Sequence, residues 1–308
     1  MALKDQIELG LSLPHRSPDP IEIAAIRQVA QRAEALGFRD LWVTNNTLDE
    51  AGGCFDSLTL LTYAAALTTT IRVGVSVLVL PVYNPIHVAH QVATLDYLSG
   101  GRAILGVGLG REQHYAEFQI PRERRVRRFL ESVELMKALW TQPKVTYQGQ
   151  IFQLQDGVMK PKPVQKPHPP VWLGGGHPDA LRRAAAIADG WMGAGGSTAA
   201  AFAKSVPVVR AALEKAGRDS ASFPISKRVF MSVHERPEVA QAEVHRWFSV
   251  VYHNPDLTTA GGVYGTPAQV REQLEALVAA GASHLLLNPV TRYTEQVEAL
   301  AEVAGLQD

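Results

Sequence analysis

The stretch WLGGGHPDALRRAAAIADGWMGAGGS, residues 172–197, holds one complete structural unit of this chain. An apolar run ends in three glycines, Pro178 opens a helical segment, and a second apolar run ends at Gly195, Gly196 and Ser197. This pattern predicts a strand, a helix and a strand, with a loop of small residues after each strand. Units of this kind build α/β folds, so their number along the chain decides the architecture.

Eight strand-like runs alternate with helical segments along the chain, with one extra helix near the end. Several strands are apolar at successive positions, which is typical of a parallel sheet covered on both faces. We therefore predict an α/β fold, a (β/α)8 TIM barrel formed by a single domain over residues 1–308, with an open doubly wound sheet as the alternative. The strands are predicted at residues 7–13, 40–44, 71–80, 102–108, 169–175, 190–194, 226–233 and 284–288.

Local sequence also predicts where two helices begin. Asp19 and Pro20 precede an apolar run with helical spacing, and Glu22 completes a start that resembles a capping box. After the fourth strand, the next helix is expected only near Pro121, and the arginine-rich run 122–128 forms its first turns. A solvated or salt-bridged face explains these arginines better than nucleic-acid binding does.

An interruption of the alternating pattern lies at about residues 143–170, between strands 4 and 5. It contains two short strand-like runs and a proline-rich return, which predicts an insertion at the rim of the barrel rather than a second domain. Its lysines, Lys160, Lys162 and Lys166, are either simply exposed or help to hold an anionic cofactor tail.

Composition excludes several classes of protein. The chain carries 30 basic and 30 acidic side chains, so no nucleic-acid or anionic-membrane partner is expected. Cys54 is the single cysteine, which excludes an internal disulfide and a cysteine-based zinc site, and His87 and His90 lack a suitable carboxylate, so we predict no metal. Without an apolar leader or a membrane-spanning stretch, the chain is expected to be cytoplasmic.

The two glycine loops of the opening stretch form a candidate anion site. Glycines 174–176 lead into a helix whose first turn Pro178 fixes, so free main-chain N–H groups and the positive end of the helix point to one place. Glycines 195 and 196 end the adjacent strand and bring a second set of donors. Either loop alone is explained by a tight turn, but the adjacent pair favours phosphate binding.

The glycine-rich segment LSGGRAILGVGLGRE, residues 98–112, only superficially resembles a dinucleotide fingerprint. Gly106, Gly108 and Gly110 give G-x-G-x-G, and Arg111 occupies the place of the third glycine. The segment is better explained as a strand that ends in a turn of small residues, so it predicts one loop of a barrel site and not a Rossmann grip.

Four segments together resemble the luciferase-like monooxygenase superfamily, whose members are flavin- or F420-dependent barrel enzymes. They are GVSVLVLPVYNPIHVAHQVATLDYLSGGRAILGVGLG (74–110), FLESVELMKALW (129–140), PVQKPHPPVWLGGGHPDALRRAAAIADGW (163–191) and GTPAQVREQLEALVAAGASHLLL (265–287). The resemblance runs from about Leu9 to Val303. It implies the barrel with its rim insertion, a phosphate site at the paired glycine loops and a homodimer.

The resemblance also implies site residues. It places Ser76-Val77 where the family often has a non-proline cis peptide behind the cofactor ring, and residues 108–111 at the turn that lines the ring. The implied cofactor-binding residues are Asn45, Ser76, Val77, Gly108, Leu109, Gly110, Arg111, Gly174, Gly175, Gly176, His177, Gly195, Gly196 and Ser197.

One departure from the family pattern concerns proton transfer. Many relatives carry an acidic residue followed by histidine after the second strand, whereas this chain has Asn45-Asn46. An amide holds a ring carbonyl or N–H group but does not act as a general base. The candidate catalytic residues, each from a loop that follows a strand, are His15, Asn45, Arg111 and His114.

The leading function is an oxidoreductase that uses F420 or reduced FMN for hydride transfer or monooxygenation of a small organic substrate. Two alternatives are a non-catalytic flavin- or F420-binding protein, which Asn45-Asn46 favours, and a phosphate-ester enzyme that uses the same anion site. The lysines of the insertion favour F420, and the missing acid–histidine pair weighs against it.

Overall fold

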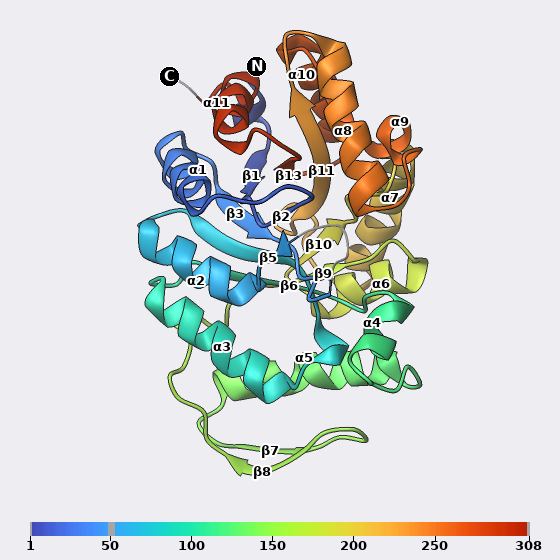
Figure 1. The fold of residues 1–308 in the computed structure, drawn as a ribbon. Helices are drawn as coiled ribbons and strands as arrows, with labels where there is room; N and C mark the ends of the chain where they lie inside the picture. Colours follow the sequence, from blue (N-terminus) through green and yellow to red (C-terminus); the bar gives the residue numbers. More distant parts are fainter. Residues whose placement is uncertain (1, 49–52, 307–308) are drawn as a thin grey trace.

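Eight parallel strands close into a barrel in the computed structural model, which describes residues 2–48 and 53–306 (Figure 1). Each strand pairs with the next, β13 pairs with β1, and β10 pairs with β11, so the sheet has no break. The predicted (β/α)8 barrel is confirmed, and the open-sheet alternative is wrong. The barrel strands are β1 (Glu8–Ser12), β3 (Asp40–Val43), β5 (Arg72–Val79), β6 (Ala103–Gly108), β9 (Val171–Gly174), β10 (Gly190–Gly193), β11 (Ile225–Val233) and β13 (His284–Pro289).

Helices cover the outside of the barrel (Figure 1). The long ones are α1 (Ile23–Ala35), α2 (Ser57–Leu67), α3 (Pro85–Leu98), α5 (Arg125–Thr141), α6 (Pro178–Ile187), α7 (Ala199–Lys215), α8 (Pro237–Val251), α10 (Pro267–Ala279) and α11 (Tyr293–Ala304). Shorter elements are α4 (Glu112–Glu117), α9 (Leu257–Gly261), β12 (Val263–Gly265), the pair β2 (Arg16–Ser17) and β4 (Gly53–Cys54), the pair β7 (Val145–Gln148) and β8 (Gln153–Gly157), and 3₁₀ turns at Leu3–Asp5 and Leu80–Val82. Among the described helices, none combines the length and the apolar character that a membrane crossing requires.

Two tryptophans fill the interior of the barrel. The rings of Trp42 and Trp172 lie 5.2 Å apart, centroid to centroid, and both side chains are buried. Glycine stands opposite them because a Cβ at Gly74 would come within 2.5 Å of the Trp42 ring, and one at Gly190 within 2.8 Å of the Trp172 ring. The barrel is therefore packed through its centre, and a binding site has room only at its ends.

Two helix starts differ from those predicted. Helix α1 begins at Ile23, and Asp19 instead pairs with Arg246 of α8, so its carboxylate does not cap α1. After the fourth barrel strand, α4 begins at Glu112, nine residues before the predicted helix start at Pro121, and α5 begins only at Arg125. In the arginine-rich run, Arg122 pairs with Glu112, as a salt-bridged face predicts, and Arg128 lies over the ring of Phe152.

The predicted insertion lies between the fourth and fifth barrel strands and forms the hairpin β7–β8 and a return segment. It leaves the end of α5 and leads into the start of β9, so it belongs to the rim where the strands begin. Lys162 donates hydrogen bonds to the carbonyl oxygens of Leu139 and Gln142, and Lys166 donates to that of Pro163. These two ammonium groups are therefore engaged away from the carboxyl ends of the strands.

Candidate active site

A cavity of about 480 Å³ opens at the carboxyl ends of the strands and is called the upper pocket below. Strands β5, β6, β9, β10 and β11 and the segments that follow them supply most of its wall. The residues that line it are Ser76, Val77, Gly108, Leu109, Gly110, Arg111, Gly174, Gly175, Gly176, His177, Ala180, Met192, Gly193, Ala194, Gly195, Gly196, Arg228 and Tyr252.

The two glycine loops meet in this pocket. Gly176 of the first loop and Gly195 and Gly196 of the second line the same cavity. Their main-chain N–H groups donate no hydrogen bond to any residue that the structure describes. Free N–H groups beside the start of a helix are suited to the oxygen atoms of a phosphate group.

The first loop is shaped by the residues around it. Gly175 has a φ of +145°, which a residue with a side chain rarely adopts, and its carbonyl oxygen accepts a hydrogen bond from Trp191 Nε1 at 2.7 Å. His177 caps α6, because its Nδ1 accepts a hydrogen bond from the N–H of Asp179. A Cβ at Gly176 would meet no atom within 4 Å, so this glycine leaves open space in the pocket.

Val77 forms the part of the wall that faces both glycine-rich turns. The Ser76-Val77 peptide bond is cis, as the resemblance implies, and the pairing of β5 with β6 shifts register at this point. A Cβ at Gly108 would lie 2.7 Å from the Val77 side chain, and one at Gly174 would lie 3.0 Å from it. Glycine is needed at both positions because Val77 occupies the space.

The loop after β6 is fixed by α4, the short helix that sequence reasoning missed. The N–H of Arg111 donates to His114 Nδ1 at 2.9 Å, and the hydroxyl of Tyr115 donates to the carbonyl oxygen of Leu109 at 2.6 Å. His114 is buried, and burial lowers its pKa. It supports the loop from behind, whereas Arg111 is exposed and lines the pocket.

His15 lies among buried residues and links the loops after β1 and β3. Its Nδ1 donates to the carbonyl oxygen of Leu13 at 2.7 Å, and its Nε2 accepts from the N–H of Thr44 at 3.0 Å. Burial, with the positive charge of Arg228, lowers its pKa to about 3. The ring is therefore neutral with both nitrogen atoms engaged, and it does not line the upper pocket.

Asn45 supports the bulge of β5 from outside the pocket. Its amide group bonds the hydroxyl of Tyr83 at 2.9 Å and accepts from the N–H of Val79 at 3.3 Å. Of the four candidate catalytic residues, only Arg111 lines the pocket. Of the candidate cofactor residues, all line it except Asn45 and Ser197, and Ser197 lines a neighbouring cavity of about 310 Å³ between α6 and α7.

Arg228 is the charged pocket residue that sequence reasoning missed. Its guanidinium is buried and donates to Asn288 Oδ1 at 2.6 and 3.0 Å and to the carbonyl oxygen of Ser76 at 3.2 Å. It forms no ion pair with a carboxylate of the described residues. Burial lowers its pKa to about 10, so the side chain is positively charged near neutral pH. The sequence did contain a signal for this residue, because Lys227 and Arg228 are two charged residues in a strand otherwise rich in apolar residues.

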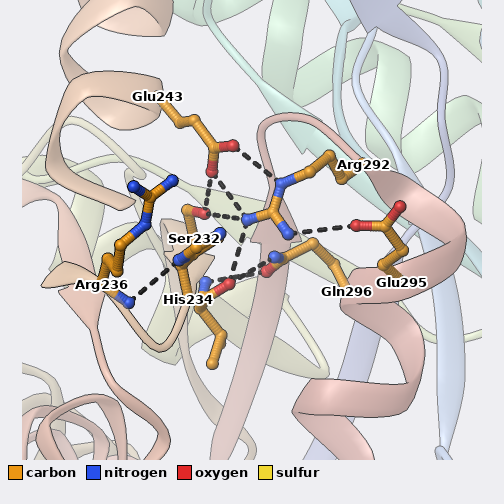
Figure 2. A network of polar contacts seen from close by, with 8 residues as sticks. Ser232, His234, Arg236, Glu243, Arg292, Glu295 and Gln296 are labelled. Atoms are coloured by element: carbon orange, nitrogen blue, oxygen red, sulfur yellow. Dashed lines mark hydrogen bonds and ion pairs between the residues drawn. The ribbon is translucent and has the colours of Figure 1, made fainter. Parts of the chain in front are cut away.

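A polar network holds the end of the strand that carries Arg228 (Figure 2). Arg292 pairs with Glu243 of α8 and donates to the carbonyl oxygen of Val233, which also accepts from Gln296 of α11. Ser232 donates to Glu243 as well. The end of β11 is therefore fixed from two helices.

The donors around the upper pocket suit an anionic organic cofactor. Its wall combines free N–H groups, apolar surface at Val77 and Leu109, and the buried guanidinium of Arg228. Within residues 2–48 and 53–306, no group of three or more histidine, cysteine, aspartate or glutamate side chains is arranged to hold a metal ion.

Comparison with protein families gives one match over most of the chain. The model described as luciferase-like monooxygenase matches residues 7–260. The chain is 29% identical over 226 residues to an F420-dependent glucose-6-phosphate dehydrogenase of Kineococcus radiotolerans, covering 71% of this chain and just under two thirds (66%) of that protein. It is 26% identical over 313 residues to an FMNH2-dependent dimethylsulfone monooxygenase of Pseudomonas putida, covering 88% and 84%.

Solved structures show the same fold. An F420-dependent secondary alcohol dehydrogenase in complex with an F420–acetone adduct superposes with a TM-score of 0.85 at 19% identity, covering 98% of this chain and 99% of that one. The monooxygenase RslO1 from Streptomyces bottropensis gives a TM-score of 0.85 at 22% identity, covering 96% and 98%. At these identities the likeness concerns the fold alone.

Proposed function

The chain belongs to the luciferase-like monooxygenase family, and from that premise we propose that it is an oxidoreductase that binds F420 or FMN in the upper pocket. Its substrate is a small organic molecule. The observation that carries the proposal is the meeting of two glycine loops whose N–H groups have no acceptor among the described residues. Relatives that use either cofactor support it.

Different pocket residues would hold different parts of such a cofactor. The N–H groups of Gly176, Gly195 and Gly196 would bind the phosphate, and Val77 and Leu109 would support the ring. Arg228 sets a fixed positive charge at the floor of the pocket, where it favours electron-rich or anionic groups. Bound there, F420 or FMN supplies hydride transfer, and reduced FMN also supplies oxygen activation.

The described residues that line the pocket include no carboxylate. Its ionisable groups are Arg111, His177, Arg228 and Tyr252, and the guanidinium of Arg228 is the buried one among them. These groups can orient a ligand and stabilise its negative charge. The one imidazole among them, His177, lies at the start of α6. We therefore propose that the protein contributes binding and electrostatics, and that protons are exchanged with solvent or with the substrate.

Absorbance titration tests the proposal directly. The purified protein is titrated with FMN and with F420, and the loaded protein is then given oxygen or candidate acceptors after reduction. Saturable binding followed by turnover supports an oxidoreductase. Tight binding with no turnover supports the non-catalytic alternative, and affinity for simple sugar phosphates without affinity for either cofactor supports a phosphate-ester enzyme.

We also propose that the protein works as a homodimer, without a nucleic-acid or membrane partner. The balanced charge of the chain supports the absence of nucleic acid. Light scattering coupled to gel filtration measures the assembly, and a mass equal to that of a single chain would contradict the dimer.

A further inference from the structure

Lys227 is a buried lysine of β11 that lies under the second glycine loop. Its residue is 2% exposed, and its ammonium group donates to the carbonyl oxygen of Ala194 at 2.7 Å and to that of Arg228 at 2.9 Å. It forms no ion pair with a carboxylate of the described residues. Because neighbouring residues of a strand point to opposite faces, Lys227 lies outside the barrel wall while Arg228 lies inside it.

The carbonyl group that Lys227 binds is the one on which the second loop closes. Ala194 O also accepts from the N–H of Ser197 at 3.1 Å and from its hydroxyl at 2.7 Å. The turn over residues 194–197 is thus tied at one oxygen atom, and the ammonium group holds that atom from below. The N–H groups of Gly195 and Gly196 are left free at the pocket.

We propose that Lys227 makes the second glycine loop a proton-linked receptor for a phosphate monoester dianion, so that FMN rather than F420 is the cofactor this chain is built to hold. The inference rests on the proposed function and deepens it. Lys227 does not touch the cofactor; it is a positioning residue that holds Ala194 O and acts on the phosphate through its charge.

The charges around Lys227 carry the argument. Neighbours in the sheet are Gly193 on β10 and Leu285 on β13, neither of which is charged, and α7 places Phe202 beside Gly193. The charged side chain that acts on Lys227 is Arg228, which repels it. A buried charge without a counter-charge is costly, and an anion bound at the loop offsets that cost.

Proton uptake follows from this arrangement. Burial, together with the neighbouring charge of Arg228, lowers the pKa of Lys227 to about 7. At pH 8 the free protein therefore holds this amine mostly neutral. A phosphate group at the loop favours the ammonium form and raises the pKa, so binding draws a proton onto Lys227.

The same charges distinguish the two cofactors. The phosphate of FMN is a monoester, which carries two negative charges at pH 8 because its second pKa is about 6. The phosphate of F420 continues into the acidic tail and is a diester with one negative charge. Attraction to the ammonium group scales with the charge at the loop, so FMN gains more from Lys227 than F420 does.

Calorimetric titration at pH 8 tests the proposal in two buffers of different ionisation enthalpy, such as HEPES and Tris. The slope of the binding enthalpy against the buffer enthalpy counts the protons taken up. We expect about one proton for FMN, fewer for F420, and none for riboflavin, which has no phosphate.

Two substitutions at Lys227 separate charge from titration. Lys227→Arg keeps a charge that does not titrate, so FMN should bind without proton uptake. Lys227→Met removes the charge and should weaken FMN about 10- to 100-fold while changing riboflavin affinity little. Lys137→Arg is the matched control, since Lys137 is a partly buried lysine of α5 that donates to the carbonyl oxygen of Ile187, and its variant should keep the uptake.

The outcomes separate this inference from the proposed function. FMN that binds the natural protein without proton uptake overturns the inference alone, and this measurement needs no variant to fold. Proton uptake that persists in Lys227→Met also overturns it. A contribution of the phosphate to affinity that is larger for F420 than for FMN does so too. If neither cofactor binds, the proposed function fails and the inference falls with it.

Discussion

Arg228 links the floor of the upper pocket to the bulge of β5. Its guanidinium bonds Asn288 twice and the carbonyl oxygen of Ser76 once, and it lies 4.6 Å above the ring of Phe230. A side chain held by several partners is pre-organised, so its charge reaches a bound ligand without a further ordering cost.

Replacing Arg228 by leucine should weaken cofactor binding about 10- to 100-fold. The change removes a buried positive charge and leaves Asn288 Oδ1 and Ser76 O without their donor. Fluorescence-quenching titration with FMN measures the effect. Arg246→Leu is the control, because Arg246 forms an exposed ion pair with Asp19 and should not alter affinity; equal affinities of the Arg228 variant and the natural protein would contradict the role given to Arg228.

Gly176→Ala should lower cofactor affinity without lowering stability. A Cβ at this position meets no protein atom within 4 Å, and the φ angle needs no glycine, so the chain tolerates the methyl group. The methyl group would stand in the upper pocket beside the free N–H, where the phosphate is expected to lie. Titration with FMN and a thermal melt measure the two effects; a fall in Tm with unchanged affinity is the result that speaks against a phosphate site here.

Single residues were predictable where the backbone itself forms the site. The glycines at 108, 174 and 195 were found from sequence because a glycine at the end of a strand indicates that another group packs closely against the backbone. In the structure each of them faces a side chain. Arg228 and Lys227 were not predicted because they lie within β11, whereas site residues of a barrel are expected in the segments that follow the strands. The burial of His15 depends on contacts with Leu13 and Thr44, which periodicity does not reveal.

At the scale of elements, Glu34 ties α1 to the start of β5. Its carboxylate accepts hydrogen bonds from the N–H groups of Thr69, Thr70 and Ile71 at 2.8, 2.6 and 3.0 Å. Burial acts to raise the pKa of Glu34, but these bonds outweigh it and lower the pKa to about 2. The ionised form is therefore the one that stabilises the native arrangement.

Glu34→Gln should lower the free energy of unfolding by about 1–2 kcal/mol at pH 7. Because the native pKa lies below the usual value of 4.5, the stabilisation is complete above pH 4.5 and is lost as the pH falls toward 2. Urea unfolding at pH 7 and pH 3 should thus show a difference in the free energy of unfolding between the variant and the natural protein, and this difference should be smaller at pH 3. Glu22→Gln is the control, because the exposed carboxylate of Glu22 makes no cap bond at the start of α1. This variant should have the same free energy of unfolding as the natural protein at either pH.

Elements were predictable in proportion to the strength of their local signals. Asn84 before Pro85 and Thr266 before Pro267 cap α3 and α10 because both side chains accept main-chain N–H groups, and a capping residue followed by proline is a strong local start signal. Helix α4 has six residues, too few for a helical period to appear, and it is held by hydrogen bonds that join His114 and Tyr115 to the turn just before it. Asp19 suits a cap, but its ion pair with Arg246 of α8 is a long-range contact.

At the scale of the whole molecule, the barrel separates stability from binding. The insertion lies at the strand starts, while the two glycine loops lie at the strand ends, where Arg228 of β11 also lines the pocket. Eight strand–helix units predicted the barrel because each strand is covered on both faces, yet the closing contact between β1 and β13 joins the two ends of the chain and has no local signature. For the same reason the sequence did not reveal on which rim the insertion lies.

The lysines of the insertion give the last prediction. Sequence reasoning offered them as partners for an anionic cofactor tail, but Lys162 bonds main-chain carbonyls at the end of α5 and Lys166 bonds that of Pro163, at the rim opposite the upper pocket. Lys160→Gln and Lys166→Gln should therefore leave the affinities for F420 and FMN unchanged. Lys162→Met should instead lower Tm by roughly 2–6 °C, since Leu139 O and Gln142 O lose their donor. A selective loss of F420 affinity in the glutamine variants would contradict this prediction and show that the insertion contacts the cofactor, because, of the two cofactors, only F420 carries an acidic tail that could reach past the pocket.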